Sequence, residues 1–168
     1  NSPDTLIDAL KWTGFDVLIT SNNHSMDRGE AGIIKTIEAL DNHGILHTGT
    51  YKQPDDRNKT LIVDVKGIKL AIISYTYGTN GIPVKNPYQV NLIDMDTIQS
   101  DIQNAKQQKP DMLIAYIHQG SEYMRQPNSE QKQLVENLFS LGVDIVLGDP
   151  PHVVQPAYKR SVAASDGS

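Results

Sequence analysis

Apolar residues recur along the chain with two periods, one helical and one extended. In residues 29–44, Ile33, Ile34, Ile37 and Leu40 fall on one helical face. Gly44 follows them as a natural helix end. The same reasoning predicts helices over 2–14, 94–108 and 128–142. Short apolar runs typical of buried strands occupy 15–20, 45–50, 111–118 and 143–148.

Residues 61–77 break this alternation, because two apolar arms are joined directly by Lys66 and Gly67, the pattern of a β-hairpin. The flanking segments 51–60 and 78–90 are polar or rich in glycine and proline, and we expect loops there. Alternating helices and strands favour an α/β fold with helices on the sheet faces. The hairpin adds an antiparallel pair, so the sequence predicts a mixed sheet.

No internal repeat or linker interrupts the pattern, which predicts one α/β domain over residues 1–160 followed by a polar tail at 161–168. The chain has 168 residues, a formal net charge of −5 and no cysteine. Disulfides, cysteine nucleophiles and thiolate metal sites are therefore excluded. Basic residues are scattered rather than clustered, so we expect no nucleic-acid partner. Any metal would be bound by His, Asn, Asp or Glu, a donor set that suits Mn, Fe, Zn or Mg.

Polar residues follow three of the predicted buried strands directly. The strand at 15–20 leads into Ser21, Asn22, Asn23 and His24. The strand at 111–118 ends in His118, which Gln119, Gly120, Ser121 and Glu122 follow. The strand at 143–148 leads into Asp149, Pro150, Pro151 and His152. If these strands run parallel, their carboxyl ends meet at one edge of the sheet, where α/β proteins bind ligands.

Simpler interpretations of these residues stay open. The asparagines are good turn formers, a histidine at a strand end is usually only a hydrogen-bonded loop residue, and the two prolines can end a strand without any further role. His43 and His47 are expected to be structural. Tyrosines at 75, 77 and 123 can line a pocket edge or serve in the core. The coincidence of three histidines is what favours a shared site, since histidine serves both as metal ligand and as general acid.

Three motifs, "SNNHSMDRG", "IHQGSEY" and "GDPPHVV", carry a resemblance to a known family. In order and spacing they resemble the bacterial capsule-synthesis family CapA, the poly-γ-glutamate synthesis proteins of the PgsA type. That family is in turn similar to calcineurin-like metallophosphoesterases. The resemblance implies a four-layer α/β/β/α sandwich with a mixed sheet and a two-metal site, in which metal ions activate water and bind phosphoryl oxygens.

The resemblance also implies roles for individual residues. Asn23, His118 and His152 match metal ligands, for Mn, Fe or Zn, and His24 matches the catalytic histidine beside the leaving group. Four further residues are expected to support the site: Asn22, Asp27, Glu122 and Asp149. Pro150 stands where the family motif has a further histidine, so one metal would lose a ligand. Other family ligands would lie upstream of residue 1, and a final strand would lie downstream, so we expect the chain to be truncated at both ends and its metal site to be incomplete.

What the resemblance implies for function is a protein of the outer face of the cell membrane, anchored through a segment outside this chain. It would assist synthesis, export or anchoring of an anionic capsule polymer such as poly-γ-glutamate, together with other capsule-synthesis membrane proteins. Two alternatives remain. One is a metal-dependent hydrolase of phosphate-containing substrates. The other is a non-catalytic scaffold that binds polymer and has a degenerate metal site, which the proline at position 150 favours.

Overall fold

The computed structural model describes residues 2–149, 152–159 and 161, and within them the strands form two separate sheets. The larger sheet has four strands in the order β3-β4-β5-β6, and β4 pairs antiparallel with β3 but parallel with β5, as does β5 with β6. Its strands are β3 (Leu61–Val65), β4 (Ile68–Thr76), β5 (Met112–His118) and β6 (Ile145–Asp149). The predicted hairpin and the mixed sheet are thus confirmed.

The smaller sheet contains β1 (Val17–Ile19) and β2 (Leu46–Thr48), which run parallel. We expected the strand at 15–20 to share one sheet with the two later strands, and this was wrong. The chain connecting β1 to β2 contains a helix that covers only one face of this pair, so the other face packs toward the larger sheet. Two sheets pressed together in this way agree with the sandwich that the resemblance implied.

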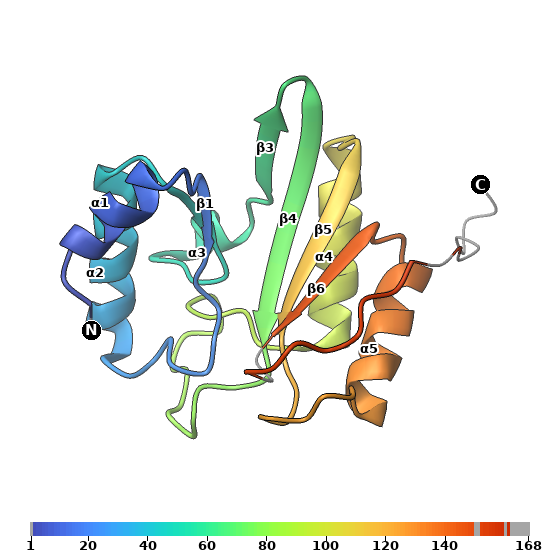
Figure 1. Ribbon diagram of the computed structural model, residues 1–168. Coiled ribbons are helices and arrows are strands. Elements are labelled where there is room, and N and C mark those ends of the chain that lie inside the picture. Colours follow the sequence, from blue (N-terminus) through green and yellow to red (C-terminus); the bar gives the residue numbers. More distant parts are fainter. Residues whose placement is uncertain (1, 150–151, 160, 162–168) are drawn as a thin grey trace.

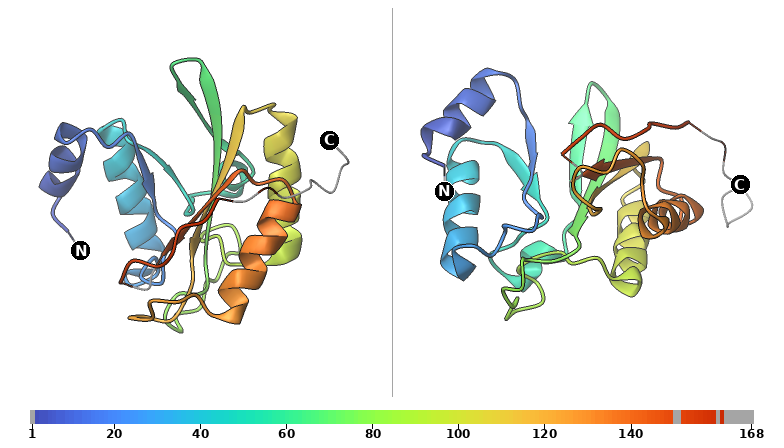
Figure 2. Two further views of the ribbon diagram at one scale, coloured as in Figure 1. Left: turned by 45° about the vertical axis from the view of Figure 1, so that its right-hand side comes forward. Right: turned by 60° about the horizontal axis from the view of Figure 1, so that its bottom comes forward.

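The helices complete four layers, which the ribbon views show from different sides (Figures 1 and 2). One outer layer holds α1 (Thr5–Trp12) and α2 (Gly29–Asn42), beside the two-stranded sheet. The other holds α4 (Met95–Gln107) and α5 (Ser129–Ser140), beside the four-stranded sheet. Both α4 and α5 begin at side-chain caps, because Asp94 accepts from Thr97 N–H and Asn128 forms a capping box with Gln131.

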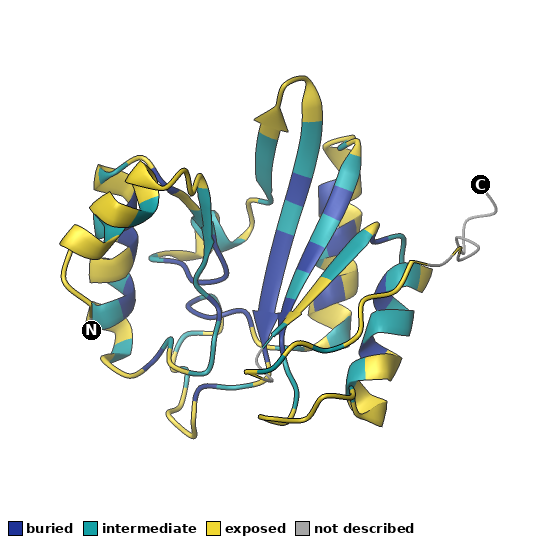
Figure 3. Cartoon of the chain, in the orientation of Figure 1, coloured by how far each residue is buried: buried dark blue, intermediate teal, exposed yellow. Residues whose placement is uncertain are grey.

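The hydrophobic core lies mainly between the four-stranded sheet and helices α4 and α5 (Figure 3). Alternate residues of β4 and β5 point into it, as the strand period requires. The fully buried members from the helices are Ile98, Ile102, Ala105 and Leu138. A smaller cluster beneath α2 contains Met26, Ile33, Ile37 and Val90. By contrast, no residue of α1 is buried.

Small polar side chains lie where the two sheets meet. Ser21 Oγ donates to Ser74 Oγ at 2.9 Å, and both residues are buried. Thr50 binds Thr20 through both its backbone N–H and its hydroxyl. Gly49 sits between the sheets with φ +109°, where an added Cβ would meet both serine hydroxyls at 2.5–2.6 Å. We call these five residues the polar seam. The Ser21–Ser74 bond joins the segment after β1 to β4, and the Thr20–Thr50 bonds join the segments after β1 and β2.

One helix, α3 (Pro54–Arg57), was not predicted. It lies in the segment 51–60, where we expected a loop. Proline at its first position and two following aspartates favour a helix start. Its end is fixed by Arg57, which binds Asp101 of α4 through two hydrogen bonds of 3.0 and 2.7 Å. Of the predicted tail, 162–168 lie outside the described residues. Among the described residues, no helix is both long and apolar enough to cross a membrane.

Candidate functional site

The loop after β1 is folded by its own asparagine and serine side chains. Asn22 Oδ1 accepts a hydrogen bond from the backbone N–H of His24 at 2.8 Å, an Asx turn. Ser25 Oγ donates to the carbonyl groups of Thr20 and Asn22, and Met26 is buried beneath the loop. Asn22 thus shapes the turn that carries Asn23 and His24.

Asn23 crosses from the β1 loop to the end of β5 and contacts His118. Asn23 Oδ1 lies 3.0 Å from His118 Nε2, although the two residues are 95 positions apart in the sequence. The other end of the same amide, Nδ2, donates to Asn80 Oδ1 at 3.1 Å. The structure therefore brings together two of the residues predicted for the site, from different sheets.

His118 is the most enclosed of the candidate residues, at 6% exposed. Burial lowers the pKa of His118, and although the carboxylate of Asp149 opposes this effect, nearby His152 and His24 add to it. The last two effects arise because a second positive charge nearby disfavours protonation. His24 and His152 therefore lie close enough to His118 to influence its charge.

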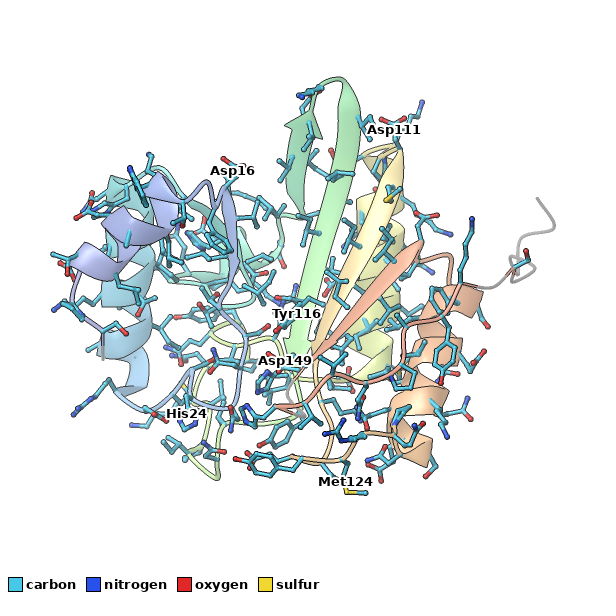
Figure 4. The ribbon with its side chains drawn as sticks, in the orientation of Figure 1. Asp16, His24, Asp111, Tyr116, Met124 and Asp149 are labelled. Atoms are coloured by element: carbon cyan, nitrogen blue, oxygen red, sulfur yellow. The ribbon has the colours of Figure 1, made fainter. Side chains whose placement is uncertain are left out.

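Two tyrosines and one carboxylate surround His118. Tyr77 stacks on its ring, with centroids 6.1 Å apart and planes 7° from parallel. Asp149 Oδ2 lies 3.7 Å from His118 Nδ1, and the same oxygen accepts a hydrogen bond from Tyr116 at 2.7 Å. Figure 4 shows Tyr116 and Asp149 close to one another near the ends of the strands, with His24 on the facing loop. The pKa of Tyr116 is raised by burial and by Asp149.

His24 and His152 each pair with a carboxylate at the solvent-exposed margin of this group. His24 Nδ1 lies 2.8 Å from Asp27 Oδ2, and the two side chains are 65% and 48% exposed. His152 Nε2 lies 3.6 Å from Glu122 Oε1, with Tyr123 tilted over its ring at 5.8 Å. Asp27 and Glu122 thus each lie beside a histidine, and their supporting role in the site stays a prediction. Among the described residues, no hydrogen bond joins the His24–Asp27 pair or the His152–Glu122 pair directly to Asn23 or His118.

Asn80 is a site residue that the sequence reasoning missed. It lies in the segment 78–90, where the sequence indicated only a loop. The Asn-Gly pair at 80–81 does predict a tight turn. Nothing in that local pattern indicates a contact with a residue 57 positions away, so no sequence signal was available for its second role.

The donor chemistry of the site suits a divalent ion only in part. Asn23 Oδ1 and His118 Nε2 are donors of the expected kinds. However, divalent ions in proteins take about four to six ligands, and within residues 2–149, 152–159 and 161 no group of three or more His, Asp or Glu is arranged to hold a metal. The described residues therefore do not make a complete metal site. Pro150 and Pro151 lie outside the described residues.

Comparison with known proteins links the chain to capsule synthesis. The model of the family "Bacterial capsule synthesis protein PGA_cap" matches residues 1–162. The capsule biosynthesis protein CapA of Bacillus anthracis is 27% identical over 96% of this chain and 41% of its own length. The PGA biosynthesis protein CapA of Bacillus subtilis (strain 168) is 32% identical over 89% of this chain and 40% of its own. The chain spans about two fifths of these relatives.

A solved structure shares the fold. The NAD nucleotidase of Haemophilus influenzae matches 98% of this chain with a TM-score of 0.50 and 20% sequence identity. The match covers 34% of that protein. At this identity the likeness concerns the fold alone, and it supports the metallophosphoesterase-like α/β architecture expected from the sequence.

Proposed function

The chain belongs to the family of bacterial capsule synthesis protein PGA_cap, and from that we propose that it is part of a protein that assists the synthesis, export or anchoring of an anionic capsule polymer such as poly-γ-glutamate. The observation that carries the proposal is the match of the family model over residues 1–162. The names of the two Bacillus relatives, which refer to capsule or PGA biosynthesis, support it.

In this proposal the Asn23–His118 contact is the centre of the site. It joins the loop after β1 to the end of β5, and the buried, stacked ring of His118 holds a fixed orientation. His24 and His152 lie at the exposed margin, where they can contact a polymer or a phosphate-containing group. The protein would act on the outer face of the membrane, with other capsule-synthesis proteins as partners.

The test is to delete the gene in its host and measure surface polymer, then to restore it with variants. The wild-type gene should restore the capsule, whereas His118→Ala and Asn23→Ala should restore much less. His43→Gln is the matched control, because His43 binds Ala39 and Asp8 on the α1–α2 side of the molecule. A deletion strain with an unchanged capsule would refute the proposal. Full restoration by His118→Ala would place the function elsewhere in the protein.

A second candidate is a metal-dependent hydrolase of phosphate esters, and one distance favours it. Two donors bound at about 2.1 Å and at right angles around one ion lie about 3.0 Å apart. Asn23 Oδ1 and His118 Nε2 are separated by 3.0 Å, which suits such a pair as well as it suits a hydrogen bond. The bound metal would activate water, and the remaining ligands would come from outside the described residues.

This second candidate is tested on the full-length protein after loading with Mn, Zn or Fe. Elemental analysis should find metal in the wild type and less in Asn23→Ala and His118→Ala, and phosphomonoester or phosphodiester turnover should fall with it. Protein that holds no metal and shows no turnover, but still supports capsule formation, would exclude the hydrolase and leave a non-catalytic scaffold. Polymer binding that persists in a strong chelator would support that scaffold directly.

A further inference from the structure

A cleft of about 640 Å³ lies between β2 and β3, which are edge strands of the two sheets among the described residues. Its walls come from the C-terminal half of α2, from β2 and the segment after it, from α3 and from the start of β3. Small-molecule sites in proteins usually have volumes of about 300–1,000 Å³. The cleft is therefore large enough for a small ligand, and none of the residues that line it belongs to the candidate site around His118.

Two buried side-chain atoms among the described residues have no hydrogen-bond partner, and both belong to this region. One is His47 Nδ1, whose side chain lines the cleft. The other is Asn91 Oδ1, beside a hollow of about 10 Å³ that shares Thr48 and Tyr51 with the cleft and has about the space of one water molecule. Buried polar atoms in native proteins are nearly always hydrogen-bonded, so this coincidence indicates that the cleft receives a polar partner.

Both of these atoms require a hydrogen-bond donor. Asp41 Oδ1 lies 3.1 Å from His47 Nε2, and since a carboxylate only accepts, neutral His47 carries its proton on Nε2 and leaves Nδ1 as an acceptor. Asn91 Nδ2 donates to the hydroxyl of Tyr51 at 3.2 Å and to the carbonyl of Ser74 at 3.1 Å, which fixes its amide with Oδ1 as the acceptor end. A ligand that suits the cleft therefore brings donors.

The charges around the cleft already balance one another. The charged residues that line it, apart from the histidine, are two lysines and two aspartates. Lys52 Nζ lies 3.0 Å from Asp41 Oδ2, and Lys59 Nζ lies 3.0 Å from Asp56 Oδ1. A charged ligand would have to compete with one of these ion pairs, whereas a neutral ligand would not. The cleft therefore favours an uncharged molecule.

From these observations we propose that the cleft binds a small neutral molecule rich in hydroxyl groups, such as a sugar unit. A small rotation of the imidazole ring brings His47 Nδ1 within reach of a ligand hydroxyl, which donates to it. Because a hydroxyl also accepts, others pair with the ammonium groups of Lys52 and Lys59, each of which has three donors. The C–H groups of the ligand pack on three apolar side chains of the lining: Ile37, Leu61 and Ile62.

The experiment measures binding of three neutral probes, glucose, N-acetylglucosamine and myo-inositol, to the full-length protein by saturation-transfer NMR and calorimetric titration. Glutamate and glucose 6-phosphate are the charged probes. At least one neutral probe should bind, and more tightly than either charged probe. His47→Phe keeps a ring but removes the acceptor, and it should weaken binding about five-fold, the effect of losing one hydrogen bond. Gln53 is exposed and lines the cleft, so Gln53→Trp should fill part of it and also weaken binding.

The matched control is His43→Phe. His43 Nε2 also lies 3.1 Å from a carboxylate oxygen, that of Asp8, but His43 does not line the cleft. This variant should bind the neutral probe as the wild type does. If none of the three neutral probes binds, or if a charged probe binds more tightly, the inference is wrong.

Two results with the variants would also overturn the inference. One is unchanged affinity in His47→Phe, with its fold checked by circular dichroism. The other is unchanged affinity in Gln53→Trp, whose exposed position makes it the safer variant should His47→Phe fail to fold. Neither measurement depends on capsule formation, so this inference can fail while the proposed function stands.

Discussion

The largely buried ion pair between Arg57 and Asp101 gives the sharpest prediction about stability. The two side chains are only 14% and 17% exposed, and they join α3 to α4. Asp101 Oδ2 also accepts from the hydroxyl of Tyr75 at 2.6 Å, and Arg57 lies over the ring of Tyr51 at 5.8 Å. Burial opposes the charge on Arg57, but its hydrogen bonds to Asp101 raise the pKa of Arg57 overall. The pKa of Tyr75 is raised by burial and by Asp101.

Replacing Asp101 by Leu would leave the guanidinium of Arg57 buried without a partner and the hydroxyl of Tyr75 without an acceptor. We expect Asp101→Leu to lower the free energy of unfolding by about 3–5 kcal/mol. In a chain of this size the change corresponds to a fall in melting temperature of roughly 6–20 °C. Replacing both partners, Arg57→Leu with Asp101→Leu, removes the unpaired charge, so the double variant should be distinctly more stable than Asp101→Leu alone.

Urea unfolding followed by far-UV circular dichroism measures these changes for the two single variants and the double variant. The control is the ion pair between Lys59 and Asp56, which has a similar 3.0 Å separation but side chains that are 71% and 32% exposed. Removing that pair should change the free energy by about 0–1 kcal/mol. A loss below about 1 kcal/mol for Asp101→Leu, or a double variant as unstable as the sum of the singles, would refute the reasoning from burial.

Three further predictions concern single positions. Gly49→Ala should destabilise the fold by about 1–3 kcal/mol or more, because a Cβ there meets two serine hydroxyls. The control Gly67→Ala has comparable φ strain without a clash, so thermal melts of both variants should show a smaller loss of stability for Gly67→Ala. Burial would raise the pKa of Asp41, but the hydrogen bond from Lys52 opposes it, and the pKa is lowered overall. The stability that ionised Asp41 contributes is therefore present above its unfolded pKa of 3.8 and is lost as the pH falls through its lower folded pKa. Asp41→Asn should lack this part of the acid-induced loss of stability in an acid titration. Asn128→Ala removes the capping box of α5 and should cost about 1 kcal/mol in urea unfolding, and an unchanged midpoint would contradict that role.

Most of the fold could be predicted from local sequence because its elements bury one face each. The helical spacing of Ile33, Ile34, Ile37 and Leu40 predicted α2, and all of them are buried except Ile34, which is partly exposed. The number of sheets could not be predicted in this way, since a strand such as Val17–Ile19 has the same local pattern in either sheet. Helix α3 was missed because what fixes it is Asp101, which lies 44 residues beyond Arg57.

For the site as well, local sequence predicted some residues and missed those that only packing brings there. Asn23 and His118 were predicted because the sequence places each near the end of a strand, but the packing of two sheets, rather than parallel pairing within one, brings them together. Asn80 was missed because its turn explains its presence locally, while its contact with Asn23 exists only after the two sheets pack. The roles of His152, Glu122 and the metal remain predictions, because their test requires ligands and residues outside the described part of the chain.

The polar seam has a consequence for how the protein tolerates change. Apolar contacts have little directional preference. The hydrogen bond between Ser21 and Ser74 is directional, so it forms only when the two sheets lie in one relative position. Ser21 stands two residues before Asn23, and Ser74 pairs with Tyr116, two residues before His118. The polar seam therefore fixes the relative position of the two sheets beside the site. Substitutions at exposed positions of the outer helices leave this alignment unchanged, whereas one at Ser21 or Ser74 would shift the two halves of the site relative to one another.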